Sequence, residues 1–84
     1  MSKVNYEDLI EIAPNFETWF RMAKAAEKLS DSKIAEEIGI DRRNVSWWAT
    51  GKFRPNMKNL KKLSDIFNVD PRLLIFKYYF EDPA

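Results

Sequence analysis

Apolar residues recur at intervals of three and four along most of this chain, the spacing at which side chains share one face of an α-helix. The clearest series lies between residues 15 and 29 and consists of Phe16, Trp19, Phe20, Ala23, Ala26 and Leu29. Charged side chains fill the positions between them. The pattern predicts a helix over residues 15–29 that supplies much of the core, because large aromatic rings fill a small domain efficiently.

Residues 30–51 predict two short helices joined by a tight turn. Ser30 and Asp41 are good N-caps, and Gly39 stands where a chain leaving a helix often needs a positive φ. The inward positions are Ile34, Ala35 and Ile38 in the first helix and Val45, Trp48 and Ala49 in the second. Because the turn is only about three residues long, the helices must cross steeply, as in a helix-turn-helix motif.

The remaining segments also predict helices. Pro55 marks a connecting loop, after which Asn56 is a plausible N-cap for a helix over 57–67 and Asn68 a plausible C-cap. Its inward positions are Leu60, Leu63, Ile66 and Phe67. Asp70 and Pro71 cap and open a last helix. No segment shows the alternation typical of a strand.

The N-terminal residues leave two alternatives open. Residues 5–12 predict either a short helix, with Tyr6, Leu9 and Ile10 on one side, or a loose arm that Pro14 ends. We therefore expect a single all-α domain over residues 1–84, with five compact helices. Residues 1–14 form an arm or a short extra helix, 15–75 the helical core, and 76–84 an aromatic tail.

Composition excludes several classes of site. The chain has no Cys and no His, so disulfides, thiolate metal sites and the usual general base are all missing. We expect no enzyme activity, no cofactor, no metal and no small-molecule ligand. No apolar run approaches the length of a membrane span, and the N-terminus is acidic where a signal peptide would be basic. We therefore expect a cytoplasmic protein without a membrane partner.

The net charge of +1 indicates no particular partner, but the charges are unevenly distributed. Residues 42–62 hold seven basic residues and no acidic one, whereas residues 1–41 hold five basic and nine acidic ones. A charge run alone is usually a solvated face. Here it coincides with the second motif helix, which favours a surface that faces phosphates.

The outward stripe of the second motif helix carries the candidate chemistry. Its positions at i, i+1, i+4, i+5 and i+8 are Arg42, Arg43, Ser46, Trp47 and Thr50, with Asn44 at the edge. Arginine can contact guanine with two hydrogen bonds and asparagine can contact adenine. We expect Arg42, Arg43 and Asn44 to read bases, with Ser46 short enough to let the helix approach. Cations near a helix N-terminus do not stabilise the helix, so stability does not explain them.

Trp47 stands on the same stripe, and three interpretations are open. Its ring can press on a thymine methyl or a sugar edge, pack on a neighbouring subunit, or fold over nearby Lys and Arg stems. Phosphate contacts are expected from the helix ends and the loop. The candidates are Lys33, Thr50, Lys52, the backbone N–H of Phe53, Arg54, Asn56 and Lys58.

Taken together, these residues resemble the Cro and cI repressor type of helix-turn-helix domain, also called the XRE family. The resemblance covers roughly 16–74. It rests on Ser30, Ile34, Ala35, Gly39, Ile40 and Asp41, on the run Gly51, Lys52, Phe53, Arg54 and Pro55, and on LKKLSDIFNVDPRLLI. It implies a five-helix, lambda-repressor-like domain that binds double-stranded DNA as a dimer on a palindromic operator.

Two positions depart from the family pattern. Asp31 stands where the family often has a Gln that bonds a phosphate, and a carboxylate there would repel phosphate unless it serves the helix start. Ala49 stands where the family often has a Glu that holds the following loop through a polar pair. The second change leaves the conformation of that loop open.

The aromatic tail predicts a way to form a homodimer. Phe76, Tyr79 and Phe80 recur at spacings of three and four, which suits a two-fold interface. The alternative is that they close the monomer's core over Trp19 and Phe20, and a mixture of the two is expected.

The function predicted from all these features is a sequence-specific transcriptional regulator of Cro, antitoxin or restriction-controller style. The alternative is a protein-interaction domain on the same scaffold. The DNA-binding interpretation requires Arg42 and Arg43 to face solvent and not to pair with the protein's own carboxylates.

Overall fold

The computed structural model describes residues 5–80, so residues 1–4 of the predicted arm and 81–84 of the predicted tail lie outside the described residues. The α-helices are α1 (Tyr6–Ile12), α2 (Phe16–Glu27), α3 (Asp31–Ile38), α4 (Arg42–Thr50), α5 (Met57–Phe67) and α6 (Pro71–Leu74). A π-helix, η1 (Ile75–Tyr79), continues α6. The described residues contain no strand, which confirms the all-α class. None of the helices they form combines the length and the apolar character needed to cross a membrane.

Side-chain caps fix where the helices begin. The predicted caps Ser30, Asp41, Asn56 and Asp70 each accept a backbone N–H from the first turn of the helix that follows. Asn5 and Asn15 do the same for α1 and α2. These bonds satisfy donors that a helix leaves unpaired at its N-terminus. The beginnings of the helices are therefore encoded locally in the sequence.

The end of α2 differs from the prediction. The helix stops at Glu27 because Lys28 adopts a left-handed conformation with φ 57°, and the amide of Leu29 donates to the Lys24 carbonyl at 3.0 Å. This Schellman-type ending reverses the chain within the three residues that separate α2 from α3. As a result Leu29 packs only partly against the core; Ala26, in the last turn of α2 and expected to face inward, is exposed.

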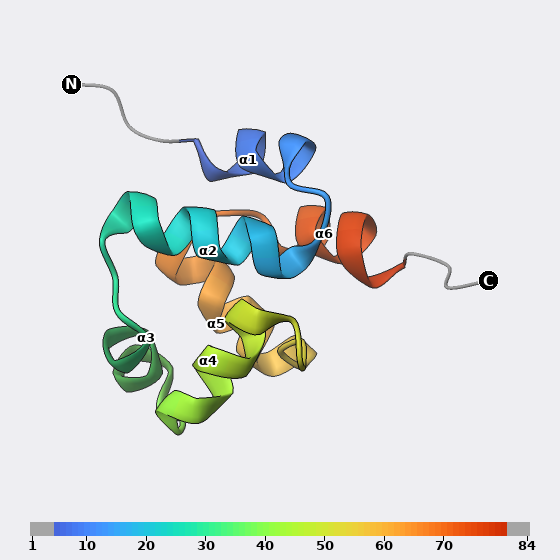
Figure 1. The fold of residues 1–84 in the computed structure, drawn as a ribbon. Coiled ribbons are helices and arrows are strands. Elements are labelled where there is room, and N and C mark those ends of the chain that lie inside the picture. Colours follow the sequence, from blue (N-terminus) through green and yellow to red (C-terminus); the bar gives the residue numbers. More distant parts are fainter. Residues whose placement is uncertain (1–4, 81–84) are drawn as a thin grey trace.

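The core is built around α2, which crosses the middle of the molecule with α1 on one side and α3 and α4 on the other (Figure 1). Phe16, Trp19 and Phe20 are fully buried. Trp19 meets the ring of Phe67 from α5 edge-on, with ring centroids 5.7 Å apart, and Phe20 meets Trp48 from α4 at 6.1 Å. Edge-to-face contacts of this kind fix the angles between helices as well as burying area.

The segment from Tyr6 to Ile12 is a docked helix, which decides between the two alternatives that the sequence left open. The Trp19 indole Nε1 donates to the Tyr6 carbonyl at 2.9 Å. From the other end of the chain, the Tyr78 hydroxyl donates to the Ala13 carbonyl at 2.9 Å. The amide of Asp70 also donates to a carboxylate oxygen of Glu7 at 3.3 Å. Hydrogen bonds from both α2 and η1 thus hold the N-terminal helix.

The π-helix changes which tail residues face inward. The amide of Phe80 donates to the Ile75 carbonyl, five residues earlier, at 3.1 Å. In this register Tyr78 is fully buried, and the Tyr79 hydroxyl donates to the Pro55 carbonyl at 2.7 Å. Only Phe76 and Phe80 remain largely exposed, at 64% and 69%. Of the three aromatics in the predicted stripe, Tyr79 thus packs against the protein's own loop, in line with the alternative that the sequence left open for this tail, while Phe76 and Phe80 stay candidates for an interface.

The buried tyrosines predict a loss of stability at high pH. Burial raises the pKa of Tyr78 to about 12, and burial together with a hydrogen bond to Glu27 raises the pKa of Tyr6 to about 12. A tyrosine in the unfolded chain titrates near 10.0, so between these values the folded state binds more protons than the unfolded state. The contribution of these two tyrosines to the free energy of unfolding is therefore constant below pH 10 and falls as the pH rises towards 12.

Urea denaturation across this pH range measures the effect. Tyr78→Phe lowers stability by about 1 kcal/mol at neutral pH, because a buried hydrogen bond is lost, and it flattens the alkaline decline. An alkaline decline equally steep in the variant and the original protein would contradict this assignment.

Candidate nucleic-acid interface

The turn between α3 and α4 sets the orientation of the second motif helix. Gly39 has φ 88°, and the amides of Gly39 and Ile40 both donate to the Ala35 carbonyl, at 2.7 and 3.0 Å. Val45 and Trp48 of α4 are 0% and 3% exposed, so the inward face is as predicted. The opposite face of α4 is thereby directed to solvent, on the lower edge of the molecule in Figure 1.

The two arginines at the start of α4 are both exposed, but they differ in their surroundings. Arg43 lies beside its own N-cap, with its Nη2 3.4 Å from an Asp41 carboxylate oxygen, and the two side chains are 76% and 54% exposed. Ion pairs this exposed contribute little and exchange readily. Arg42 thus faces solvent and, within the described part of the chain, has no carboxylate within ion-pair distance. Arg43 also faces solvent, but it forms this weak pair with Asp41. Asn44 and Ser46 are half-buried beside them.

Asp41 therefore has two tasks at the start of α4. Its carboxylate accepts the backbone N–H of Arg43 at 2.8 Å and lies within reach of the Arg43 guanidinium. The backbone hydrogen bond, followed by the guanidinium, lowers the pKa of Asp41 below its usual value. The carboxylate stays charged at neutral pH, fixes the helix start and lies beside the Arg43 guanidinium without holding it firmly.

A hollow of about 340 Å³ lies between the start of α3 and the outward face of α4. Its lining consists of Ser30, Asp31, Ser32, Arg42, Arg43 and Ser46. The Asp31 carboxylate does not stand there uncompensated, because it pairs with the ammonium of Lys24 on α2. The departure from the family pattern at this position thus joins α2 to α3. The neutralised Asp31 leaves the arginines to dominate the field in the hollow.

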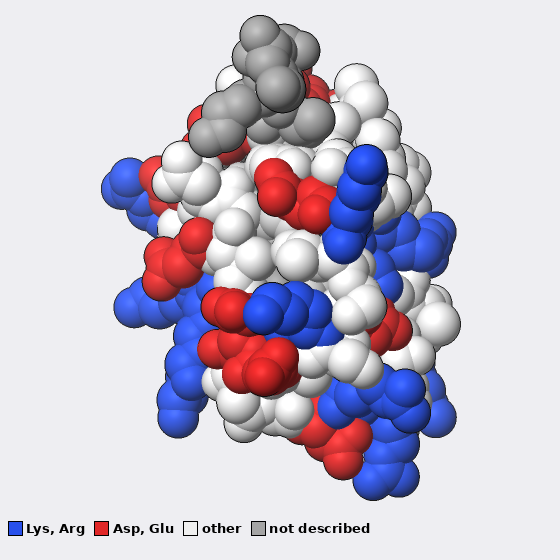
Figure 2. Space-filling model, turned by 90° about the vertical axis from the view of Figure 1, so that its left-hand side faces the viewer, with Lys and Arg blue, Asp and Glu red and all other residues white. Residues whose placement is uncertain are grey.

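Charges of both signs are mixed over the side of the molecule that carries α3 (Figure 2). Blue basic side chains gather at the lower end of that view, which is the level at which α4 begins in Figure 1. Lys33 on α3 lies 3.7 Å from a Glu37 carboxylate oxygen and 3.9 Å from one of Glu36. The basic character of this face therefore comes from α4 and the segment after it more than from α3.

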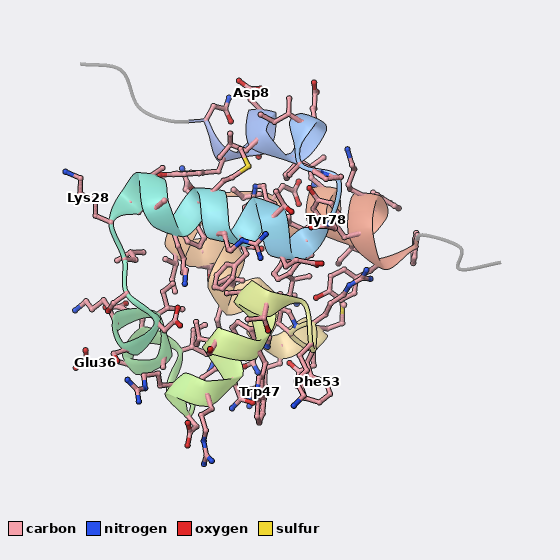
Figure 3. The ribbon with its side chains drawn as sticks, viewed as in Figure 1. Asp8, Lys28, Glu36, Trp47, Phe53 and Tyr78 are labelled. Atoms are coloured by element: carbon pink, nitrogen blue, oxygen red, sulfur yellow. The ribbon has the colours of Figure 1, made fainter. Side chains whose placement is uncertain are left out.

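Trp47 lies beside the loop that follows α4. Its ring meets that of Phe53 edge-on, with centroids 5.3 Å apart, and the Lys52 ammonium lies 5.3 Å from the Trp47 centroid. Figure 3 shows Trp47 and Phe53 together on the lower edge of the molecule. Of the three interpretations of Trp47, the one in which the ring lies against a neighbouring basic side chain is supported by the contact with the Lys52 ammonium. The ring is still only half-buried, so the other two stay open.

Internal hydrogen bonds shape this loop. The Trp47 carbonyl accepts from the Lys52 amide at 3.0 Å, from the Phe53 amide at 3.4 Å and from the Thr50 hydroxyl at 3.2 Å. Gly51, with φ 84°, makes this turn possible. The Phe53 amide and the Thr50 hydroxyl, both predicted phosphate donors, thus already have partners within the chain.

The other predicted phosphate contacts fall into two groups. The Arg54 guanidinium donates to the Tyr78 carbonyl and lies 5.5 Å from the Tyr79 ring, so it joins the loop to η1. The Asn56 side chain caps α5 by accepting the Asn59 amide at 2.8 Å. Lys52 and Lys58 are exposed along the same edge. Lys52 and Lys58 are therefore better placed to contact phosphates than Arg54 and Asn56, whose side chains are bonded within the chain.

Arg21 connects α2 to the end of α4, at the position where the family resemblance led us to expect a Glu. Its guanidinium, on α2, donates to the Ala49 carbonyl near the end of α4. The Glu17 carboxylate lies against Gly51, so close that a Cβ on that glycine would come within 2.7 Å of its Oε2. Sequence reasoning missed Arg21, because nothing in its spacing links α2 to a residue 28 positions later.

Replacing Arg21 with Met tests this contact. The change keeps the aliphatic stem and removes the donor, so the Ala49 carbonyl loses a charge-assisted hydrogen bond worth about 1.5 kcal/mol or more. Urea denaturation should show this loss, while Lys61→Met, a change at an exposed α5 side chain, should stay within about 0.5 kcal/mol. Equal stability of both variants would contradict the role given to Arg21.

Comparison with known proteins identifies the same region. A helix-turn-helix family profile matches residues 20–74, which is well over half of the chain. The chain is also 32% identical over 54 residues to the HTH-type transcriptional activator BcrR of Enterococcus faecalis. That similarity covers 64% of this chain and 26% of the relative, so the chain spans about a quarter of that protein's length. The comparison with solved structures gives no match. The profile match contains α3 and α4 and leaves out α1 and η1.

Proposed function

The chain belongs to the Cro/cI-type (XRE) helix-turn-helix family of DNA-binding transcription regulators, and we propose that it is a sequence-specific regulator that binds duplex DNA through α4. One observation carries the proposal. Helix α4 buries Val45 and Trp48 while Arg42 and Arg43 stand exposed beside a hollow of about 340 Å³. This arrangement presents the start of a short helix to the major groove, where side chains reach base edges.

Each residue at the start of α4 has a proposed role. Arg42 and Arg43 contact guanine through its O6 and N7 atoms, and Asn44 contacts adenine. Ser46 is small enough to let the helix lie close to the bases, and Trp47 lies one turn further along. Arg43 exchanges its weak contact with Asp41 for the base, a change that an exposed pair permits at little cost.

Phosphate contacts position the domain on the duplex. Lys52 and Lys58 lie on the segment after α4, and Lys33 lies on α3 at the other side of the groove-facing helix. Thr50, Asn56 and the backbone N–H of Phe53 complete the proposed set, although each also has a partner within the chain. Arg54 contributes indirectly, because its bond to the Tyr78 carbonyl holds the loop in place.

We also propose that two copies pair and occupy a palindromic site. Phe76 and Phe80 lie with ring centroids 5.5 Å apart, are largely exposed, and have Leu73 nearby in sequence at 40% exposure. An exposed apolar patch of this kind suits a two-fold interface. The two α4 helices of such a dimer would enter major grooves about 34 Å apart.

Fluorescence anisotropy with a random duplex at low salt tests the function. Binding that weakens as salt rises is expected, because lysines and arginines displace counterions from phosphates. Selection of bound duplexes from a random pool then gives the site, its symmetry and the half-site spacing together. Absence of binding to any duplex would favour the alternative, a partner-binding domain on the same scaffold.

Replacing Arg42 with Ala tests base reading. The change should weaken binding to the selected site by about 1–3 kcal/mol and relax the preference at one base pair, because a bidentate contact to guanine is lost. Anisotropy titrations against all four base pairs at each position measure both effects.

Lys58→Ala is the matched control for a phosphate contact. It should weaken binding to all sequences alike and lower the salt slope by about 0.9. If Arg42→Ala behaves in the same uniform way, Arg42 does not read a base.

Replacing Phe76 with Asp tests the interface. A buried carboxylate opposes association, so the variant should sediment as a monomer and lose cooperative binding to the two half-sites. Ala26→Asp, at an exposed position of α2, is the control and should sediment like the original protein. A dimer that survives Phe76→Asp would place the interface elsewhere.

A further inference from the structure

Three side chains next to the base-reading residues form a cluster outside the hydrophobic core. Trp48 belongs to the core, whereas Trp47 and Phe53 do not pack against it. Phe53 is 52% exposed and Trp47 is half-buried. Together with Lys52, they form what we call the aromatic platform.

Backbone hydrogen bonds in the turn after α4 bring the side chains of the aromatic platform together. Four donors converge on the Trp47 carbonyl, namely the amides of Gly51, Lys52 and Phe53 and the Thr50 hydroxyl, and the left-handed Gly51 turns the chain so that Phe53 returns to Trp47. The Lys52 ammonium lies over both rings, 5.3 Å from the centroid of Trp47 and 5.9 Å from that of Phe53. The two rings stand at 75° to each other, which leaves apolar surface beside the cation.

Stability does not explain this arrangement. A single edge-to-face pair contributes little, while aromatic surface left exposed to water forgoes the free energy that its burial would contribute. The core already contains three other edge-to-face contacts around Phe67 and Phe20. We therefore expect the aromatic surface on the outward side of α4 to contact another molecule.

We propose that the aromatic platform is a binding site for the C5-methyl group of a thymine in the major groove. This inference rests on the proposed function. Thymine is the base that presents a methyl group there, and apolar side chains are the usual contact to it. The Lys52 ammonium, at the rim of the platform, faces the phosphate of the same strand. The aromatic platform would thus contact both the methyl group of the base and a phosphate.

The geometry also predicts where the thymine lies. Trp47 follows Arg43 by four residues, so both share one side of α4 and are separated by about 6 Å along its axis. Successive bases on one strand are about 3.4 Å apart. The thymine should therefore lie one or two base pairs from the base pair that Arg43 reads.

Deoxyuridine is the probe that tests this site, because it keeps every hydrogen-bonding group of thymidine and lacks only the methyl group. Each thymine of the selected duplex is replaced singly by deoxyuracil, and affinity is measured by anisotropy. We expect one position in each half-site to weaken binding about fourfold, the factor that corresponds to one buried methyl group.

Variants assign that loss to the platform. Trp47→Ala and Phe53→Ala should bind the thymine and deoxyuracil duplexes equally, whereas Ile12→Ala, at an exposed residue of α1, should keep the fourfold difference. Lys52→Ala should keep the difference and lower the salt slope by about 0.9. Thermal melting confirms that each variant is folded.

The outcomes separate this inference from the proposed function. Binding to duplex without any deoxyuracil-sensitive position, or with a sensitivity that survives Trp47→Ala, overturns the platform and leaves the regulator in place. Absence of binding to any duplex overturns both.

Discussion

The contact between Trp48 and Phe20 is the interaction on which the outward face of α4 depends. Phe20 is fully buried in α2, and Trp48 packs against it from α4 with only 3% of its surface exposed. Since residues on a helix are fixed relative to one another, burying Trp48 in this position directs the basic side chains of α4 to solvent. A helix of nine residues is too short to hold this orientation by its own stability. The core therefore determines what the surface presents.

Helix α2 positions both helices of the motif through polar contacts as well. Lys24 pairs with Asp31 at the start of α3, and Arg21 donates to the Ala49 carbonyl near the end of α4. Arg21 and Lys24 lie about one turn apart on α2. These contacts from α2 hold both ends of the motif, while the bonds on the Trp47 carbonyl shape the loop that follows α4.

Local signals made most of the fold predictable from sequence, and distant contacts account for what was missed. Ser30, Gly39, Asp41 and Asn68 act through backbone atoms a few residues away, so their roles follow from type and position. Tyr78 instead donates to Ala13, 65 residues earlier, a contact that no spacing rule indicates. The same limit applies to the site. The outward stripe of α4 follows from helical periodicity, whereas the bonds of Arg21 and Arg54 to distant carbonyls depend on how the helices pack.

The weak pair between Arg43 and Asp41 has a consequence for how strictly a DNA site would be read. In the proposed complex Arg43 exchanges a carboxylate for guanine, and leaving this exposed pair offsets a small part of what the base contact contributes. Among residues 5–80, no ion pair involves Arg42, so Arg42 breaks no such pair when it contacts a base. Each half-site would then contain one strict and one tolerant position, and natural operators could diverge at the tolerant position while the protein still recognises them.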